Sequence, residues 1–165
     1  MRPKSIVDWA EVISALAVVI TLFYVGYQVK QNTETVRTTV LNDISTDLNR
    51  LFTAGMDESM ATLITKADDS PDALTQVDKE RLFNHYGLFI SVFEATWRHR
   101  EAGRITAEYF DTMVPILCKT HGSPMGLDFW FEWKEAITQG YWYEITKRCN
   151  FVKPDIKDSW YPAPK

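Results

Sequence analysis

One uncharged apolar run near the N-terminus dominates the hydrophobic pattern of the chain. Its eighteen residues, from Val12 to Val29, contain no charged side chain. At a helical rise of about 1.5 Å per residue, the run covers most of the hydrocarbon core of a bilayer. Trp9 precedes the run and Tyr27 lies near its end, so aromatic rings mark both boundaries where they favour the headgroup layer. The pattern predicts a transmembrane anchor formed by residues 1–29.

A cleaved signal peptide is the alternative interpretation of this run, because Arg2 and Lys4 precede it as a basic region precedes a signal sequence. The run is longer than the usual apolar region of a signal peptide, and Asp8 and Glu11 interrupt its basic start. No cleavage pattern of small residues follows it. We therefore interpret the segment as an uncleaved anchor.

The helical pattern continues after the anchor, but with only one apolar side. No proline occurs between the anchor and Pro71, and Gly55 suits a helix C-cap. Asn, Asp, Ser and Thr occupy the other sides of the helix. We therefore predict a stalk helix over residues 30–54 that packs one side on a domain. Its apolar positions are Val36, Val40, Ile44, Leu48 and Leu51.

Capping residues predict the next two helices. Asp57 caps a short helix through Ala67, and Thr75 starts a longer helix that Gly103 ends. Between residues 82 and 97 most positions are apolar or aromatic. This longer helix is expected to be the centre of the domain.

Three further helices complete the predicted domain. Thr106 caps the first, in which Pro115 produces either a kink or a restart. Ser123 caps the second, which Gly140 is expected to stop. The third is expected over residues 141–149.

The resulting fold class is all-α, with one N-terminal transmembrane helix that continues as a long stalk helix, followed by a small aromatic-rich helical bundle. Residues 30–152 form the predicted soluble domain, and the proline-rich and charged residues 153–165 are expected to be extended or disordered. Of the 22 aromatic residues, 17 lie from Phe83 onward, so the second half of the chain is expected to bury a dense aromatic core.

Charge and motif content exclude several functional classes. The formal net charge of −4 argues against nucleic acid as a partner. The chain contains no GxGxxG, P-loop, GxSxG or HExxH pattern, and its three histidines fall in different segments. Cys118 and His121 are close in sequence but lack a third group to orient the base. We therefore expect no enzyme activity, no metal site and no cofactor.

The two cysteines, Cys118 and Cys149, are too few for a disulfide framework and lack the spacing of a zinc or redox motif. A single bridge between them would form if the domain faces an oxidising compartment, whereas in the cytosol both would remain thiols. Their number does not distinguish the two sides of the membrane.

Two groups of residues are candidate contact sites. Small or hydrogen-bonding residues recur along one side of the anchor, and such a seam permits close approach of a second transmembrane helix. Basic residues gather before and after Gly103, where they complement a helix macrodipole or contact an anion or lipid headgroup. The seam consists of Ala10, Ser14, Ala17, Thr21 and Gln28, and the basic group of Arg98, Arg100 and Arg104.

Several segments carry a resemblance to known sequences. They are Trp9 with EVI at residues 11–13, AVVITLFY at residues 17–24, QVKQNT at residues 28–33, GRITAEYF at residues 103–110, and Gly126 with Phe129 and Trp130. In these segments, and over most of its length, the chain resembles an uncharacterised family of short bacterial single-span membrane proteins with a helical soluble domain. The resemblance implies no activity or ligand. It implies a cytoplasmic domain, but Arg2 and Lys4 depart from the family pattern, so a periplasmic domain stays open.

These patterns lead to one functional hypothesis and one alternative. The hypothesis is a non-catalytic, membrane-anchored interaction or accessory subunit of a membrane protein assembly. The alternative is a small-molecule or lipid sensor whose aromatic residues line a cavity in the helical domain. The expected partners are membrane lipid and another transmembrane helix, from a second copy of the chain or from a larger complex.

Overall fold

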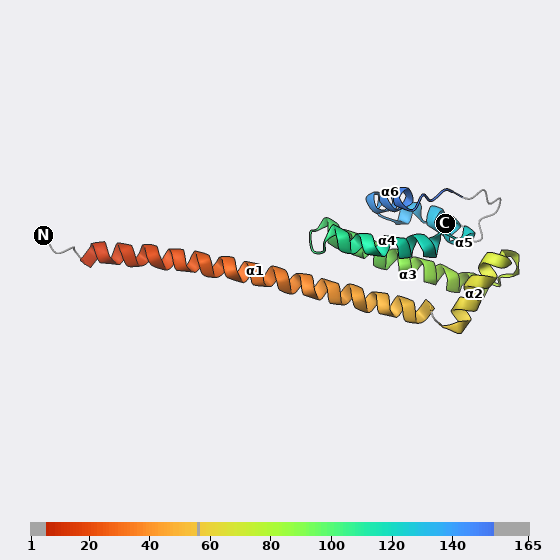
Figure 1. Cartoon of the computed structure of the whole chain (residues 1–165), viewed down its shortest axis with the longest axis horizontal. Helices are drawn as coiled ribbons and strands as arrows, with labels where there is room; N and C mark the ends of the chain where they lie inside the picture. Colours follow the sequence, from red (N-terminus) through yellow and green to blue (C-terminus); the bar gives the residue numbers. More distant parts are fainter. Residues whose placement is uncertain (1–5, 56, 154–165) are drawn as a thin grey trace. The chain divides into compact units, whose positions relative to one another are not determined.

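The computed structural model describes residues 6–55 and 57–153, and these residues form helices and connecting turns with no β-strand (Figure 1). The all-α prediction is therefore confirmed. Short 3₁₀ turns at Pro71–Ala73 and Lys134–Ala136 lie between the helices. The helices are α1 (Ile6–Gly55), α2 (Glu58–Asp69), α3 (Gln76–Glu101), α4 (Ala107–His121), α5 (Pro124–Glu132) and α6 (Gln139–Arg148).

Helix α1 runs for 50 residues without an internal proline and ends at Gly55, as the sequence predicts. The chain nevertheless divides into two compact units between Thr39 and Val40, so α1 contributes to both. In the first unit the helix is long and apolar enough to cross a membrane. Its large apolar side chains, between Trp9 and Val29, are 46 to 77% exposed. Exposure of so much apolar surface on every side of a helix fits a lipid environment.

The last part of α1 belongs to the second unit and is buried on one side. Val40, Ile44 and Leu51 are at most 8% exposed and join the core of this unit. Val36, the first position of the predicted apolar stripe, is 49% exposed. The stripe is therefore a packing surface only from Val40 onward.

Helix α3 lies at the centre of the second unit, as predicted, and contacts α2, α4 and α5. Thr75 accepts a hydrogen bond from the backbone N–H of Asp78, whose carboxylate accepts from the backbone N–H of Thr75. This reciprocal pair satisfies two backbone donors that the helix start would otherwise leave free. Six residues of α3 are at most 5% exposed: Leu82, Tyr86, Phe89, Ile90, Phe93 and Thr96.

Most of the other predicted helix boundaries are also confirmed. Asp57, Thr106 and Ser123 each accept hydrogen bonds from backbone N–H groups of the following turn. Gly103 has a φ of +66°, a conformation that costs glycine little, and it follows the end of α3. Pro115 lies inside a continuous α4, so a restart of the helix at this position does not occur.

The prediction that Gly140 stops a helix is wrong. Helix α5 ends at Glu132, and Gly140 lies in the first turn of α6. A Cβ atom at this position would lie 3.2 Å from the Trp97 ring on α3. Glycine is therefore found here because α6 approaches the indole of Trp97 closely, a tertiary reason that the local sequence does not reveal.

Aromatic side chains form the interior of the second unit, in line with the predicted aromatic core. Trp130 is fully buried, and its ring meets those of Tyr141 and Phe151 edge-on at centroid distances of 6.0 and 5.6 Å. The Trp130 Nε1–H donates to the hydroxyl of Thr146, so its polar end is also satisfied. Edge-on aromatic pairs add to the stabilisation from burial alone.

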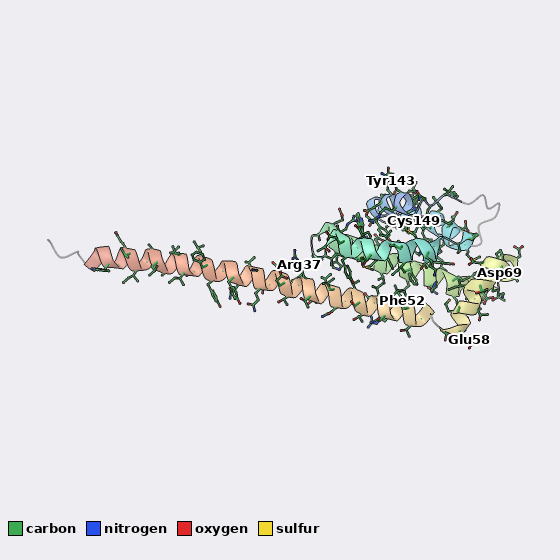
Figure 2. All side chains as sticks on the ribbon, in the orientation of Figure 1. Arg37, Phe52, Glu58, Asp69, Tyr143 and Cys149 are labelled. Carbon is green, nitrogen blue, oxygen red and sulfur yellow. A yellow bond between two sulfur atoms is a disulfide. The ribbon has the colours of Figure 1, made fainter. Side chains whose placement is uncertain are left out.

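Of the two alternatives for the cysteines, the single bridge is the one found, because Cys118 and Cys149 form a disulfide with a Cα–Cα distance of 5.2 Å. Figure 2 shows Cys149 close to the end of α6. The bond joins α4 to the residue that follows α6, across a sequence separation of 31 residues. It closes a covalent loop that contains α5 and α6.

Loss of this disulfide should destabilise the second unit substantially. For a closed loop of this length, the entropy of the unfolded chain predicts a loss of about 3 to 4 kcal/mol when both cysteines are replaced by alanine. Urea unfolding of the full chain in detergent, followed by tryptophan fluorescence, measures the difference. Equal unfolding midpoints for the two proteins would contradict a stabilising role of the bond.

Candidate functional site

The seam residues predicted on the anchor all lie on exposed positions of α1. At about 100° per residue, Ala10, Ser14, Ala17, Thr21 and Gln28 fall within an arc of about 60° on one side of the helix. The Thr21 hydroxyl donates a hydrogen bond of 2.8 Å to the Ala17 carbonyl, which satisfies it within its own helix. Ala10, Ser14 and Ala17 leave little side-chain bulk on this side, so a second helix backbone could approach closely.

The predicted basic group near Gly103 has partners within the protein. Arg98 pairs with Glu94 at 2.6 Å, as its spacing predicts, and also donates to the Thr138 hydroxyl. Arg100 donates to both carboxylate oxygens of Glu144 at 2.6 Å. Arg104 lies 3.3 Å from the His99 ring nitrogen. Contact of these arginines with an external anion stays a prediction, and carboxylates already engage two of the three.

Glu144 is the centre of the ion-pair network to which Arg100 belongs. It also accepts a hydrogen bond from the Trp97 indole at 2.8 Å and pairs with Arg148 at 3.1 Å. Arg148 in turn contacts Asp111 at 2.7 Å, so the network connects α3, α4 and α6. The hydrogen bonds from Arg100 are the main reason that the pKa of Glu144 falls to about 2. Glu144 is therefore ionised at neutral pH, and the network links α3, α4 and α6.

The clearest hollow in the second unit is a pocket of about 490 Å³ between the last turns of α1 and helices α2, α3 and α4. Its volume lies in the range of small-molecule sites, which is roughly 300 to 1,000 Å³. Leu51, Ile64, Phe89 and Ile116 supply apolar walls from these four helices. Phe52, which Figure 2 places near the end of α1, lines the pocket and is 37% exposed.

The polar groups of the pocket come from three different helices and the turn after α4. Asp68 and Lys119 are exposed residues of its lining, and His85 is partly buried there. The Tyr86 hydroxyl lies 3.5 Å from the Ser123 hydroxyl. Burial lowers the pKa of His85 and raises that of Tyr86, so both side chains are neutral near pH 7. The fixed charges in the pocket lining are therefore one carboxylate and one ammonium group.

No short motif in the sequence could have identified this pocket. Its lining residues are spread from Leu51 to Ser123, and each helix contributes two or three of them. Sequence reasoning assigned the aromatic residues of α3 to a core, and the structure places Tyr86 and Phe89 both in that core and at the pocket. The enrichment in aromatic residues was the only signal available.

His121 is fully buried beside Tyr86, Phe89 and Trp130, with ring centroids between 5.4 and 6.5 Å away. Neither ring nitrogen makes a hydrogen bond of standard geometry. Burial lowers its pKa to about 4, because an imidazolium ion there would lose its water without gaining a carboxylate partner. The imidazole is therefore neutral at physiological pH.

The arrangement offers no support for nucleophilic or metal chemistry. Cys118 is bonded to Cys149, so it supplies no thiolate to pair with His121. No cluster of three or more His, Cys, Asp or Glu side chains with metal-binding geometry occurs within residues 6–55 and 57–153.

Comparison of the chain with protein-family models, with curated proteins and with solved structures gives no match.

The buried neutral His121 predicts a loss of stability in mild acid. The pKa of its imidazole is about 4 in the folded protein and 6.5 in its ordinary state, so the unfolded chain binds the proton first as pH falls. Above pH 6.5, the contribution of His121 to the free energy of unfolding should be constant. Between pH 6.5 and 4, protonation of the unfolded chain should lower the free energy of unfolding by about 3 kcal/mol. Urea unfolding at a series of pH values measures this decline.

Two comparisons assign the decline to His121. His121→Phe should flatten the profile between pH 6.5 and 4.5, whereas the matched variant His99→Phe should retain it. Asp78 and Glu144 have pKa values of about 2, so their contributions are lost at lower pH. His85 acts in the same direction as His121 and accounts for part of any residual slope. An unchanged slope in His121→Phe would contradict the assignment.

Proposed function

We propose that the protein is a non-catalytic accessory subunit that a single transmembrane helix holds within a membrane protein assembly. The observation that carries the proposal is the exposed apolar segment of α1, which has a narrow seam of small residues on one side. Lipid tails are as apolar as the surface of another helix, so two transmembrane helices gain nothing from the hydrophobic effect when they associate. Their association depends on close packing and on hydrogen bonds. The seam provides both, through Ala10, Ser14 and Ala17 and through the side chain of Gln28.

The disulfide supports a position of the second unit on the oxidising side of the membrane. Disulfides persist outside the cytosol, in compartments such as the bacterial periplasm. In this orientation Arg2 and Lys4 lie on the cytoplasmic side, where basic residues next to a span are favoured. The family pattern suggests a cytoplasmic domain instead, but the Cys118–Cys149 bond favours the periplasmic alternative.

Ligand binding is the second candidate function, and the pocket among α1, α2, α3 and α4 favours it. A ligand-binding domain requires a hollow that holds a molecule larger than water, which a solidly packed interior does not provide. A pocket of about 490 Å³ with apolar walls and a few polar groups meets this requirement. An accessory subunit and a ligand-binding domain are compatible within one chain.

Bulk on the seam should weaken helix association. We expect Ser14→Leu combined with Ala17→Leu to reduce the crosslinking yield with the partner helix about tenfold, because the added side chains separate the two backbones. Insertion should be unaffected, since both changes raise the hydrophobicity of the span. The matched control, Val18→Leu with Val19→Leu, adds bulk away from the seam. Equal yields for the two double variants would show that the seam faces only lipid.

The proposed orientation can be tested with single introduced cysteines. In a chain with alanine at both native cysteine positions, Val152→Cys places a thiol at a position that is 74% exposed in the native protein. This thiol should react with a membrane-impermeant maleimide in intact cells, whereas Ser5→Cys should react only after lysis. The reverse pattern would place the second unit in the cytoplasm. Acid quenching and alkylation of the native chain should find its cysteines bonded.

A further inference from the structure

The pocket contains two charged side chains of opposite sign that have no ion-pair partner among the described residues. Asp68 lies near the end of α2 and Lys119 in the last turn of α4. The seven ion pairs of the second unit engage charges on α1, α2, α3, α4 and α6, and neither Asp68 nor Lys119 is among them. Asp68 lines the pocket together with Tyr86, whose pKa is raised mainly by burial and also by the charge of Asp68.

The sign of these charges restricts what the pocket would hold. A simple anion would gain from Lys119 and be repelled by Asp68, and a simple cation would experience the opposite. A molecule that carries both charges gains from both side chains. His85, Tyr86 and Ser123 are neutral and add hydrogen-bonding groups without changing this balance.

The apolar walls determine the other end of the ligand. Leu51, Ile64, Phe89 and Ile116 line the hollow with apolar side chains, and Phe52 adds a partly exposed ring. Burial of an aliphatic or aromatic group against these side chains would stabilise the complex by roughly 25 cal/mol for each Å² removed from water. The pocket volume of about 490 Å³ accommodates a chain of roughly eight carbons with a polar head.

We propose that this pocket binds a small amphiphile with a zwitterionic end, whose cationic group faces Asp68, whose anionic group faces Lys119 and whose apolar body lies against Leu51, Ile64, Phe89 and Ile116. The proposal deepens the second candidate function, ligand binding, and does not depend on a partner for the transmembrane helix. A lipid headgroup and a free apolar amino acid share this chemistry.

A series of eight-carbon amphiphiles tests the charge requirement. Octyl betaine is zwitterionic, octanoate is anionic and octyltrimethylammonium is cationic, while the apolar chain is the same. The full chain in nanodiscs is titrated with each compound by calorimetry, with empty nanodiscs as the background. We expect saturable binding of octyl betaine that is about tenfold tighter than that of either singly charged compound.

Variants locate the binding to the pocket. Asp68→Asn and Lys119→Gln should each weaken octyl betaine binding several-fold, and Asp68→Asn should at the same time improve octanoate binding. Asp69→Asn and Lys147→Gln are matched controls, because these residues are exposed, lie near helix ends and do not line the pocket. Gly55→Leu should block binding, since a Cβ atom there lies 3.6 Å from His85 at the pocket. Circular dichroism verifies the fold of each variant.

Several results would overturn the proposal. Absence of saturable binding of octyl betaine, equal affinity for all three compounds, or equal effects of the pocket variants and their controls would each do so. If Gly55→Leu fails to fold, the two charge variants still decide the question. If octyl betaine binds, titration with L-phenylalanine and with lysophosphatidylethanolamine distinguishes a free amino acid from a lipid headgroup as the ligand. Failure of this series leaves the crosslinking test of the seam unaffected, so the two proposals fail separately.

Discussion

The structure depends on one constraint. Helix α1 has no internal break, yet its first part and its last part must suit two different surroundings. Between Trp9 and Val29 the side chains of α1 are apolar and exposed, as a lipid environment requires. From Val40 onward an apolar stripe of the same helix is buried in a core with its own aromatic interior. Polar residues, rich in threonine, separate the two stretches. The surface of α1 therefore changes along its length through composition alone, without a loop.

Local features of this fold were predictable from the sequence, and tertiary features were not. The caps at Asp57, Thr75 and Ser123 use side chains within three residues of the backbone groups they satisfy, so sequence spacing is sufficient to find them. Gly140 was assigned to a helix end because its real constraint, the Trp97 ring, lies more than 40 residues away. The sequence leaves the pairing of Cys118 with Cys149 open, because the number of cysteines does not distinguish an oxidising compartment from the cytosol.

The candidate sites follow the same division between local and distant information. The seam on α1 is a property of helical periodicity and was visible in the sequence. The sequence suggests that the basic residues near Gly103 could contact an anion. In the structure Arg100 donates hydrogen bonds to Glu144 of α6, and no local sequence pattern predicts this partner. The pocket requires four helices to assemble before it exists. Binding sites between helices are consequently the part of such a protein that sequence patterns reveal least.

The closed loop between Cys118 and Cys149 also affects how the protein would respond to mechanical force. A load applied between α1 and the C-terminus would pass through the disulfide and not through α5 and α6. The disulfide would keep the chain between the two cysteines from being extended. With a sequence separation of 31 residues, this chain would span roughly 100 Å at about 3.3 Å per residue. Under tension, the segment that contains Trp130 and Tyr141 would remain a closed covalent loop while the rest of the unit unfolded.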